Sequence, residues 1–273
     1  MKKTVLITGS STGIGKECAL YFHKKGWQVV ATMRNPETRT TELHGIENID
    51  LIHLDVTNID SIRSAIAYAK EKFGTIDVIV NNAGYAVLGL FEATNREQAE
   101  SQFNTNVFGP LDVIREVIPV LREQKCGIII NTTSVGGRIA VPMYSLYNST
   151  KWALEGFSEA LSYELRPFNI KVKVVEPGFT KTDFYGRSMD ITTKEGLEMY
   201  DAYVSTTQKN LEKPAKKGSH PSVIAKTIFK AASDGSWKFR YPTGAGARYI
   251  LLMRKCLPDR LFRFVLRMNM SQK

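Results

Sequence analysis

The chain has 273 residues, of which 43% are hydrophobic and 23% charged, and its formal net charge is +10. A chain of this length can bury a core large enough to fold without disulfides or metal ions. Its three cysteines, Cys18, Cys126 and Cys256, include no C-x-x-C pair, so we expect no disulfide framework and no metal site. The sequence shows no signal-peptide pattern and no apolar run of about 18 residues, so we expect a cytoplasmic protein without a transmembrane helix.

The positive charge is confined to the last quarter of the chain. Residues 1–203 hold 22 basic against 24 acidic residues, whereas residues 204–273 hold 15 against 3. A basic chain first suggests a nucleic-acid partner, but this distribution would make such a site an appendage. We therefore expect no nucleic acid to bind.

Short apolar runs rich in β-branched residues alternate with longer amphipathic stretches along the chain. The runs lie at residues 4–8, 28–32, 51–54, 76–80, 127–131, 172–175 and 238–241. Helical patterns lie at residues 13–25, 58–73, 95–120, 145–167 and 222–233. This alternation predicts an α/β fold in one domain, a doubly wound parallel sheet of about seven strands with helices on both faces.

The loop after the first strand carries the first functional signal, because ligands of such sheets bind beyond the carboxyl ends of the strands. It reads Thr8-Gly9-Ser10-Ser11-Thr12-Gly13-Ile14-Gly15 and leads into a helix. Glycines let the backbone approach a pyrophosphate closely, and the helix N-terminus favours its negative charge. We predict that the nucleotide is contacted by Gly9, Ser11, Gly13, Ile14 and Gly15. A merely tight turn is the alternative.

The spacing of these glycines is G-x-x-x-G-x-G rather than the G-x-G-x-x-G of ordinary dinucleotide-binding folds. With its preceding threonine, the loop resembles the classical branch of the short-chain dehydrogenase/reductase family. That family consists of NAD(P)-dependent oxidoreductases with a Rossmann-like domain, and the resemblance extends to about residue 183. It implies a catalytic domain over residues 1–243 and a homodimer or homotetramer formed through the helices at 95–120 and 145–167.

The end of the second strand favours one cofactor over the other. NAD enzymes place an acidic residue there to bind the ribose, but Thr32-Met33-Arg34 contains no carboxylate. Nothing then repels a 2′-phosphate, which the planar guanidinium of Arg34 can hold. We predict NADP(H) as the preferred cofactor, with NAD(H) possible. The alternative is that Arg34 is a solvated loop residue.

Two further strand ends match the family. The resemblance implies that Asp55, followed by Val56, contacts the adenine amino group. Its alternative role is to cap the helix at 58–73, although Thr57 or Asn58 could do so instead. After the fourth strand, the motif N-N-A-G implies that Asn81 is structural and that the cofactor is faced by Asn82, Ala83 and Gly84.

The strongest group of residues is Tyr147 and Lys151, which lie on the same face of a predicted helix. The pKa of free tyrosine is near 10, and a neighbouring ammonium lowers it by favouring phenolate. Ser134 lies thirteen residues before Tyr147, at the family's spacing, and its hydroxyl can stabilise charge on a carbonyl oxygen. A solvated Tyr–Lys pair is the alternative for Y-x-x-x-K by itself.

The resemblance adds residues around this group. It implies that Asn106 bends a helix and holds a water of a proton relay, whereas a helix-interior asparagine bonded to its own backbone is the alternative. It also implies that the nicotinamide lies against Pro177 and Gly178, with Thr182 on its carboxamide and Thr180 as a backbone contact. The cofactor set also includes Tyr147 and Lys151, whose ammonium binds the ribose hydroxyls.

These residues predict an NADP(H)-dependent alcohol dehydrogenase or carbonyl reductase whose catalytic set is Ser134, Tyr147, Lys151 and Asn106. Residues 183–220 show no regular pattern and correspond to the family's substrate lid. Its aromatic and methionine content favours an apolar ligand, with Ser134, Val135, Met143, Tyr147 and Phe179 as substrate contacts.

The stretches around Arg34, Ser134 and Tyr147 resemble hydroxysteroid and retinol dehydrogenases most, which implies a hydrophobic alcohol or ketone as substrate. A 3-ketoacyl-thioester reductase is the alternative enzyme. A cofactor-binding regulator or scaffold is the alternative from another class, although such members usually lose the tyrosine or the lysine.

The extension at residues 244–273 combines apolar and basic residues, and Pro258 divides it into two predicted helices. An apolar face beside an arginine-rich face is typical of an interfacial membrane helix. We rank packing on the protein first and peripheral membrane contact second.

Overall fold

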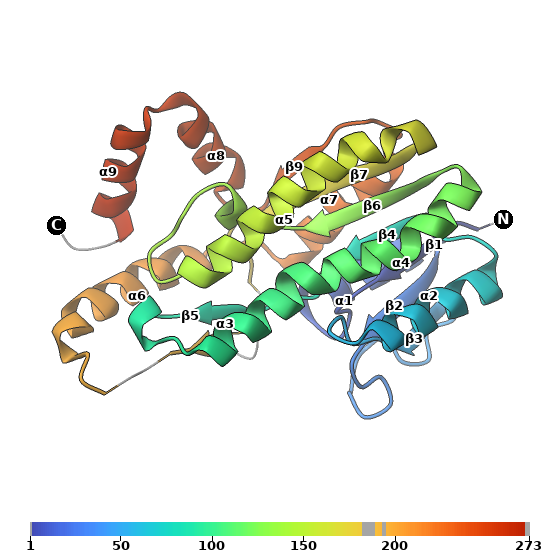
Figure 1. Ribbon diagram of the computed structural model, residues 1–273, viewed down its shortest axis with the longest axis horizontal. Helices are drawn as coiled ribbons and strands as arrows, with labels where there is room; N and C mark the ends of the chain where they lie inside the picture. Colours follow the sequence, from blue (N-terminus) through green and yellow to red (C-terminus); the bar gives the residue numbers. More distant parts are fainter. Residues whose placement is uncertain (1, 182–188, 193–194, 271–273) are drawn as a thin grey trace.

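The computed structural model describes residues 2–181, 189–192 and 195–270, and of residues 189–191 it describes only the backbone. The predicted carboxamide contact Thr182 and residues 183–188 and 193–194 of the predicted lid lie outside this description. Figure 1 shows the molecule, with β1 and α9 toward opposite sides.

Seven parallel strands form the central sheet, as the sequence predicts. They are β1 (Thr4–Ile7), β2 (Gln28–Met33), β3 (Ile49–His53), β4 (Val78–Asn81), β6 (Gly127–Thr132), β7 (Ile170–Pro177) and β9 (Arg240–Thr243). Their spatial order is β3-β2-β1-β4-β6-β7-β9, so the direction of winding reverses between β1 and β4. A ligand crevice is expected beyond this reversal.

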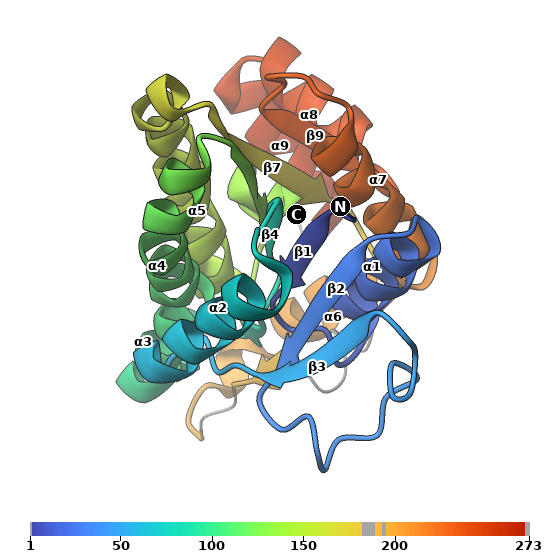
Figure 2. The same ribbon diagram turned by 90° about the vertical axis from the view of Figure 1, so that its right-hand side faces the viewer.

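Helices cover both faces of the sheet, as Figure 2 shows end-on. One face carries α1 (Gly13–Lys24) and α7 (Pro221–Ser233). The other carries α2 (Ile59–Phe73), α4 (Gly109–Gln124) and α5 (Ser145–Glu164). Because the strands are buried on both faces, they read as continuous apolar runs rather than as alternating ones.

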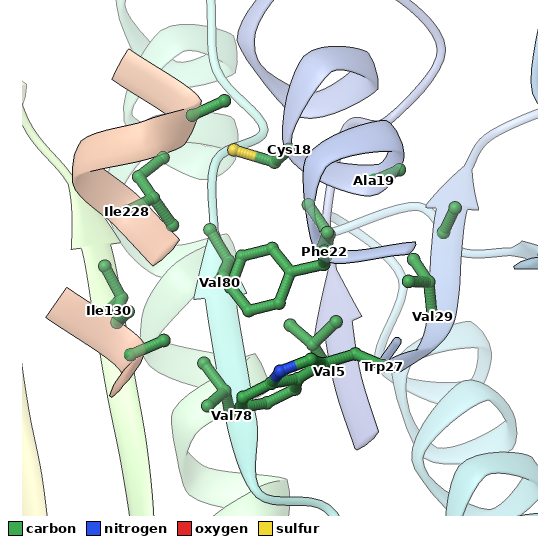
Figure 3. Packing of buried hydrophobic residues seen from close by; sticks show 14 of the residues in the cluster. Val5, Cys18, Ala19, Phe22, Trp27, Val29, Val78, Val80, Ile130 and Ile228 are labelled. Carbon is green, nitrogen blue, oxygen red and sulfur yellow. The ribbon is translucent and has the colours of Figure 1, made fainter. Parts of the chain in front are cut away.

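The core under α1 and α7 shows what holds one face together (Figure 3). Phe22 of α1 is fully buried and meets Trp27 edge-on, with ring centroids 5.1 Å apart. Val5 and Val80 of the sheet lie beneath it in the same cluster. Burying one large apolar side chain stabilises a fold by about 2 kcal/mol, so this contact fixes α1, and with it the loop that α1 follows.

The predicted helix at 95–120 is interrupted in the structure. It consists of α3 (Arg96–Phe103), a π-helical turn at Asn104–Phe108, and α4. Asn95 begins α3 with a capping box to Gln98. The π turn inserts an extra residue per turn, as π turns often do at functional sites, and it holds the fully buried Asn106.

The region predicted as an irregular lid contains regular structure. β5 (Ala86–Leu88) pairs with β8 (Met189–Ile191) in a second, two-stranded sheet, and α6 spans Asp201–Lys216. Of the α6 side chains only Thr207 and Leu211 are buried. Such a thin buried stripe gives almost no apolar periodicity, which is why the sequence pattern did not show this helix.

The C-terminal extension forms two helices, α8 (Ala247–Cys256) and α9 (Asp259–Met270), and the break at Pro258 confirms the prediction. Figure 1 shows them at one end of the molecule, on the same side as α6. α8 contacts β9, and α9 contacts α6. Within the described ranges, every helix is too short or too polar to span a bilayer.

Candidate active site

A cavity of about 1140 Å³ lies beyond the carboxyl ends of the strands. Most of the predicted site residues line it. On the predicted cofactor side these are Gly9, Ser11, Gly13, Ile14, Arg34, Asp55, Val56, Asn82, Ala83, Gly84, Pro177, Gly178 and Thr180. Around the predicted chemical centre they are Ser134, Val135, Tyr147, Lys151 and Phe179.

Close backbone packing shapes the glycine loop after β1. Gly9 has a φ of +69°, and a Cβ there would lie 2.8 Å from the Cα of Ala83. A Cβ at Gly15 would lie 2.2 Å from the carbonyl oxygen of Gly9. Gly15 therefore does not line the cavity but lets α1 approach the loop. In the described chain the Thr12 side chain makes no capping hydrogen bond, so the N-terminal amides of α1 face the cavity without one.

Asparagine and threonine side chains tie neighbouring strand ends together. The Asn82 amide donates to the carbonyl oxygens of Thr8 and Gly9, at 3.0 and 3.2 Å. The Thr8 hydroxyl accepts from the backbone N–H groups of Asn82 and Ala83. Asn81 donates to the Asn131 side chain on β6, which supports its predicted structural role. These bonds fix the loops against each other before any ligand arrives.

At the far end of the cavity, Asp55 accepts hydrogen bonds from the backbone N–H and the hydroxyl of Thr57. The cap of α2 is Asn58, so the capping role considered for Asp55 is wrong and its carboxylate remains on the cavity wall. Arg34 is exposed on this wall, and Arg39 lines the same end. No sequence motif marked Arg39, because it lies in the irregular segment between β2 and β3.

Ser134 and Tyr147 meet at the middle of the cavity. Ser134 follows β6, and its Oγ accepts a hydrogen bond from the Gly136 N–H at 3.0 Å. Burial raises the pKa of Tyr147 to about 12, while a hydrogen bond with Ser134 acts in the opposite direction. The sequence led us to expect a lowered pKa for this phenol. In the chain by itself, burial outweighs that effect because ionisation would place a charge in a poorly solvated site.

Lys151 lies one helical turn after Tyr147 and is buried. Its Nζ donates to the Thr132 carbonyl oxygen at 3.0 Å and lies 5.7 Å from the centre of the Tyr147 ring. Burial lowers the pKa of Lys151 to about 8, although the nearby Glu155 carboxylate raises it. A solvated Tyr–Lys pair, the alternative considered from the sequence, is therefore wrong.

Asn106 stands behind this centre rather than on the cavity wall. Its amide donates to the Tyr85 carbonyl oxygen at 2.8 Å and to the Thr150 hydroxyl at 3.2 Å, and its Oδ1 accepts from the Tyr85 N–H. The alternative of bonding to its own helix backbone is wrong. A Cβ at Gly84 would lie 3.0 Å from Asn106 Oδ1. The N-A-G turn can therefore pack this closely on the π turn because residue 84 is a glycine.

The other end of the cavity is apolar. Its wall includes the predicted Val135 and Phe179 together with Val141, Tyr144 and Leu211. Tyr144 meets Tyr147 edge-on with centroids 5.7 Å apart; its place three residues earlier on the same helical face is a signal that could have revealed it. The predicted contact Met143 does not line the cavity. Its side chain is buried in a cluster with Tyr144 and Leu211.

Comparison with known proteins gives a consistent result. A family profile described as short chain dehydrogenase matches residues 3–191. An uncharacterized oxidoreductase of Schizosaccharomyces pombe is 41% identical over 230 residues, which cover 84% of this chain and 96% of that protein. A 3-ketodihydrosphingosine reductase of Bacteroides thetaiotaomicron is 34% identical over 265 residues, 96% of each chain.

Two solved structures are similar along most of the chain. A short-chain dehydrogenase from Streptomyces avermitilis has a TM-score of 0.83 and 31% identity, covering 98% of this chain and 96% of that one. The protein ElxO, solved with NADP bound, has a TM-score of 0.73 and 31% identity, covering 88% of this chain and 96% of that one.

Proposed function

This chain belongs to the short-chain dehydrogenase/reductase family of oxidoreductases, and we propose that it uses NADP(H) to interconvert a hydrophobic ketone and its alcohol. The observation that carries the proposal is the position of Tyr147 between two unlike halves of one cavity. On one side lie the glycine loop and the open amides of α1, and on the other lies an apolar wall.

The residues present fit a dinucleotide phosphate. At Gly9 and Gly15 the neighbouring backbone lies where a Cβ would be, so only glycine permits this close turn. The N-terminus of α1 favours an anion. Arg34 and Arg39 lie at the end where a 2′-phosphate would be held, and β2 ends without a carboxylate. The binding of NADP by the similar protein ElxO supports the same choice. When bound, the cofactor would supply the hydride and, in its oxidised form, a positive charge near the phenol.

The chain's own residues would handle the proton and the oxygen. Ser134 donates to the carbonyl oxygen and steadies the charge that develops there. Tyr147 gives its phenolic proton to that oxygen during reduction and takes it back during oxidation. Lys151 holds a positive charge beside Tyr147 and favours the phenolate that results. Asn106 keeps the Tyr85 backbone and Thr150 in place beneath this group.

The apolar end favours a long hydrocarbon substrate. Among the cavity-lining residues that the structure describes, the charged ones other than Lys151 are Arg34, Arg39 and Asp55, at the opposite end. A substrate bearing a phosphate or carboxylate at its tail would find no charged partner at the apolar end among the described residues. The relative named as a 3-ketodihydrosphingosine reductase supports a long-chain β-keto lipid over a steroid.

Oxidation of NADPH with a set of ketones tests the proposal. We expect turnover to increase with chain length for 3-keto alcohols and to be much faster with NADPH than with NADH. Thioester-bound 3-ketoacyl chains serve as the competing substrate class, and a preference for them would favour the alternative enzyme. Absence of turnover with every ketone and thioester, with NADPH bound, would favour a regulator or scaffold.

We also propose that the protein forms a homo-oligomer through α4 and α5. Phe108, the last residue of the π turn that precedes α4, is 54% exposed, and Trp152 on α5 is 47% exposed. Contiguous exposed apolar patches mark contacts with other chains, and we expect these two residues to contribute to such a patch. Sedimentation equilibrium should show a dimer or tetramer that the substitution Trp152→Glu dissociates. A monomer at all concentrations would contradict this.

A further inference from the structure

The C-terminal helices α8 and α9 present apolar rows to solvent. On α9, Leu261, Phe264 and Met268 recur at the spacing of one helical face and are 46%, 50% and 44% exposed. On α8, Tyr249 and Leu252 recur in the same way and are 71% and 59% exposed. Both helices bury other residues against the protein, so these rows are what remains uncovered after α8 and α9 have packed.

A basic row runs beside each apolar row, displaced by one residue. On α9 it consists of Arg260, Arg263 and Arg267, all exposed. On α8, the exposed Arg248 immediately precedes Tyr249, and the exposed Lys255 lies seven residues after Arg248 on the same helical face. Residues 244–273 contain seven basic residues and one acid, Asp259, which pairs with Arg254 at 2.5 Å.

This surface is joined to the apolar end of the cavity. Phe262 of α9 is buried, and Met270 packs against the cluster that contains Tyr144 and Leu211, both of which line the cavity. α9 also contacts α6, which carries the exposed Lys209 and Lys213 and is followed by the exposed Lys217. Figure 1 shows α6, α8 and α9 together at one end of the molecule.

We propose that the α8–α9 face docks on an anionic lipid bilayer, with the apolar rows in the interface and the basic rows at the headgroups. An anionic membrane interface removes the apolar rows from water and also pairs the basic rows with negative charge. A second copy of the chain packed through the same face would bring two arginine-rich surfaces together, with Asp259 as the one acidic residue of each 244–273 segment to pair them. A nucleic acid would pair with the arginines but leave Leu261 and Phe264 in water. Docking here would place the apolar end of the cavity near the bilayer.

Flotation of the full chain with lipid vesicles tests the proposal. The probes are vesicles of phosphatidylcholine alone and vesicles in which about a third of the lipid is phosphatidylglycerol, at low and at high salt. We expect the chain to float with the anionic vesicles, to stay unbound with the neutral ones, and to be released in part by salt. Because the assay needs no turnover, its result is independent of the proposed reaction.

Two double substitutions distinguish the contributions of the apolar row and the basic row to vesicle binding. Leu261→Ser with Phe264→Ser removes the apolar row, and Arg260→Glu with Arg267→Glu reverses two charges of the basic row. We expect each pair to weaken partitioning onto anionic vesicles by about tenfold or more. The matched controls are Val223→Ser and the pair Lys226→Glu with Lys230→Glu, exposed positions on α7, and they should bind like the unchanged chain.

Other results would overturn the proposal. These are no flotation of the unchanged chain at low salt, or flotation that neither substituted pair weakens. A dimer that Leu261→Ser with Phe264→Ser dissociates, without vesicle binding, would assign the face to a second copy. Binding of a DNA or RNA oligonucleotide without vesicle binding would assign it to nucleic acid. Circular dichroism of each variant checks that its fold is intact.

Discussion

The two ends of the cavity are built in opposite ways. The cofactor end consists of backbone turns and short polar side chains that directly follow β1, β2, β3, β4 and β7, and hydrogen bonds such as that from Asn82 to Thr8 lock them together. The substrate end consists of apolar side chains from the 3₁₀ turn at Val135–Gly137, the segment that leads into α5, the loop after β7, and α6, with α9 packed behind them.

This difference has a physical consequence. Phosphate binding requires amides at fixed positions, which close backbone packing provides at little entropic cost when the ligand binds. Binding a hydrocarbon requires only enclosed apolar area, which can come from segments far apart in the sequence. Substitutions at the cofactor end should therefore impair function strongly. Substitutions at the substrate end should weaken substrate binding without abolishing the reaction.

The largest effect is expected at the centre, where the two ends meet. Tyr147→Phe removes the phenolic proton but keeps the ring that packs on Tyr144, so we expect kcat to fall about a thousandfold or more while NADPH affinity changes little. Steady-state kinetics and NADPH fluorescence titration measure both. Tyr144→Phe is the matched control and should keep kcat within severalfold. Substantial activity in Tyr147→Phe would remove this residue from the mechanism.

The burial of Lys151 should make the free energy of unfolding depend on pH. Its folded pKa of about 8 lies below that of a free lysine, so between pH 8 and pH 10.5 the unfolded chain binds more protons and the free energy of unfolding rises with pH. For the cofactor-free protein we expect this rise, from pH 7 to pH 10, to exceed that of Lys151→Met by about 2–3 kcal/mol. Urea denaturation at both pH values measures it. Equal slopes in the two proteins would show that Lys151 is solvated.

The cofactor end should discriminate between the two nicotinamide cofactors. We expect Arg34→Ala to lower the ratio of kcat/KM for NADPH over NADH by roughly tenfold to a hundredfold, because a charged hydrogen bond to the 2′-phosphate is lost. Arg39→Ala shows whether the second arginine of this wall contributes. Arg96→Ala, on exposed α3, is the control. An unchanged ratio in Arg34→Ala would mean that this side chain is solvated when the cofactor binds.

The smallest effect is expected at the substrate end. Leu211 of α6 is buried and lines the cavity, so Leu211→Ala should raise KM for a long-chain ketone by roughly tenfold and leave KM for NADPH unchanged. The control Leu121→Ala empties a comparable volume under α4, away from the cavity, and should lower stability without changing either KM. If Leu211→Ala changes both KM values equally, the two ends are not independent.

Much of the cofactor end was predictable because each of its motifs follows a strand. Apolar runs locate the strands, and a parallel sheet brings their carboxyl ends to one edge, so Gly9, Asp55 and Asn82 had to lie together. The pair Tyr147 and Lys151 was predictable for a similar reason, since helical spacing fixes their common face. In each case a local pattern and one rule of topology suffice.

The substrate end could not be predicted in this way. Leu211 lies 64 positions after Tyr147, and no periodicity marks α6, because only one thin stripe of that helix is buried. Met143 looked like a wall residue, but its left-handed backbone, with a φ of +66°, accompanies a side chain buried behind the wall. The π turn that carries Asn106 arises from its bonds to Tyr85 and Thr150, which are far away in the chain.

The sequence by itself therefore determined the order of the strands along the chain, the turns that follow them and the residues proposed to carry the chemistry, because these depend on short-range spacing. Only the tertiary structure decided how the cavity closes. It placed α6 and α9 over the apolar end, buried Lys151 deeply enough to lower its pKa, and left the apolar rows of α8 and α9 uncovered. The burial of a side chain depends on contacts with segments that are far apart in the sequence, so a local sequence pattern cannot predict it.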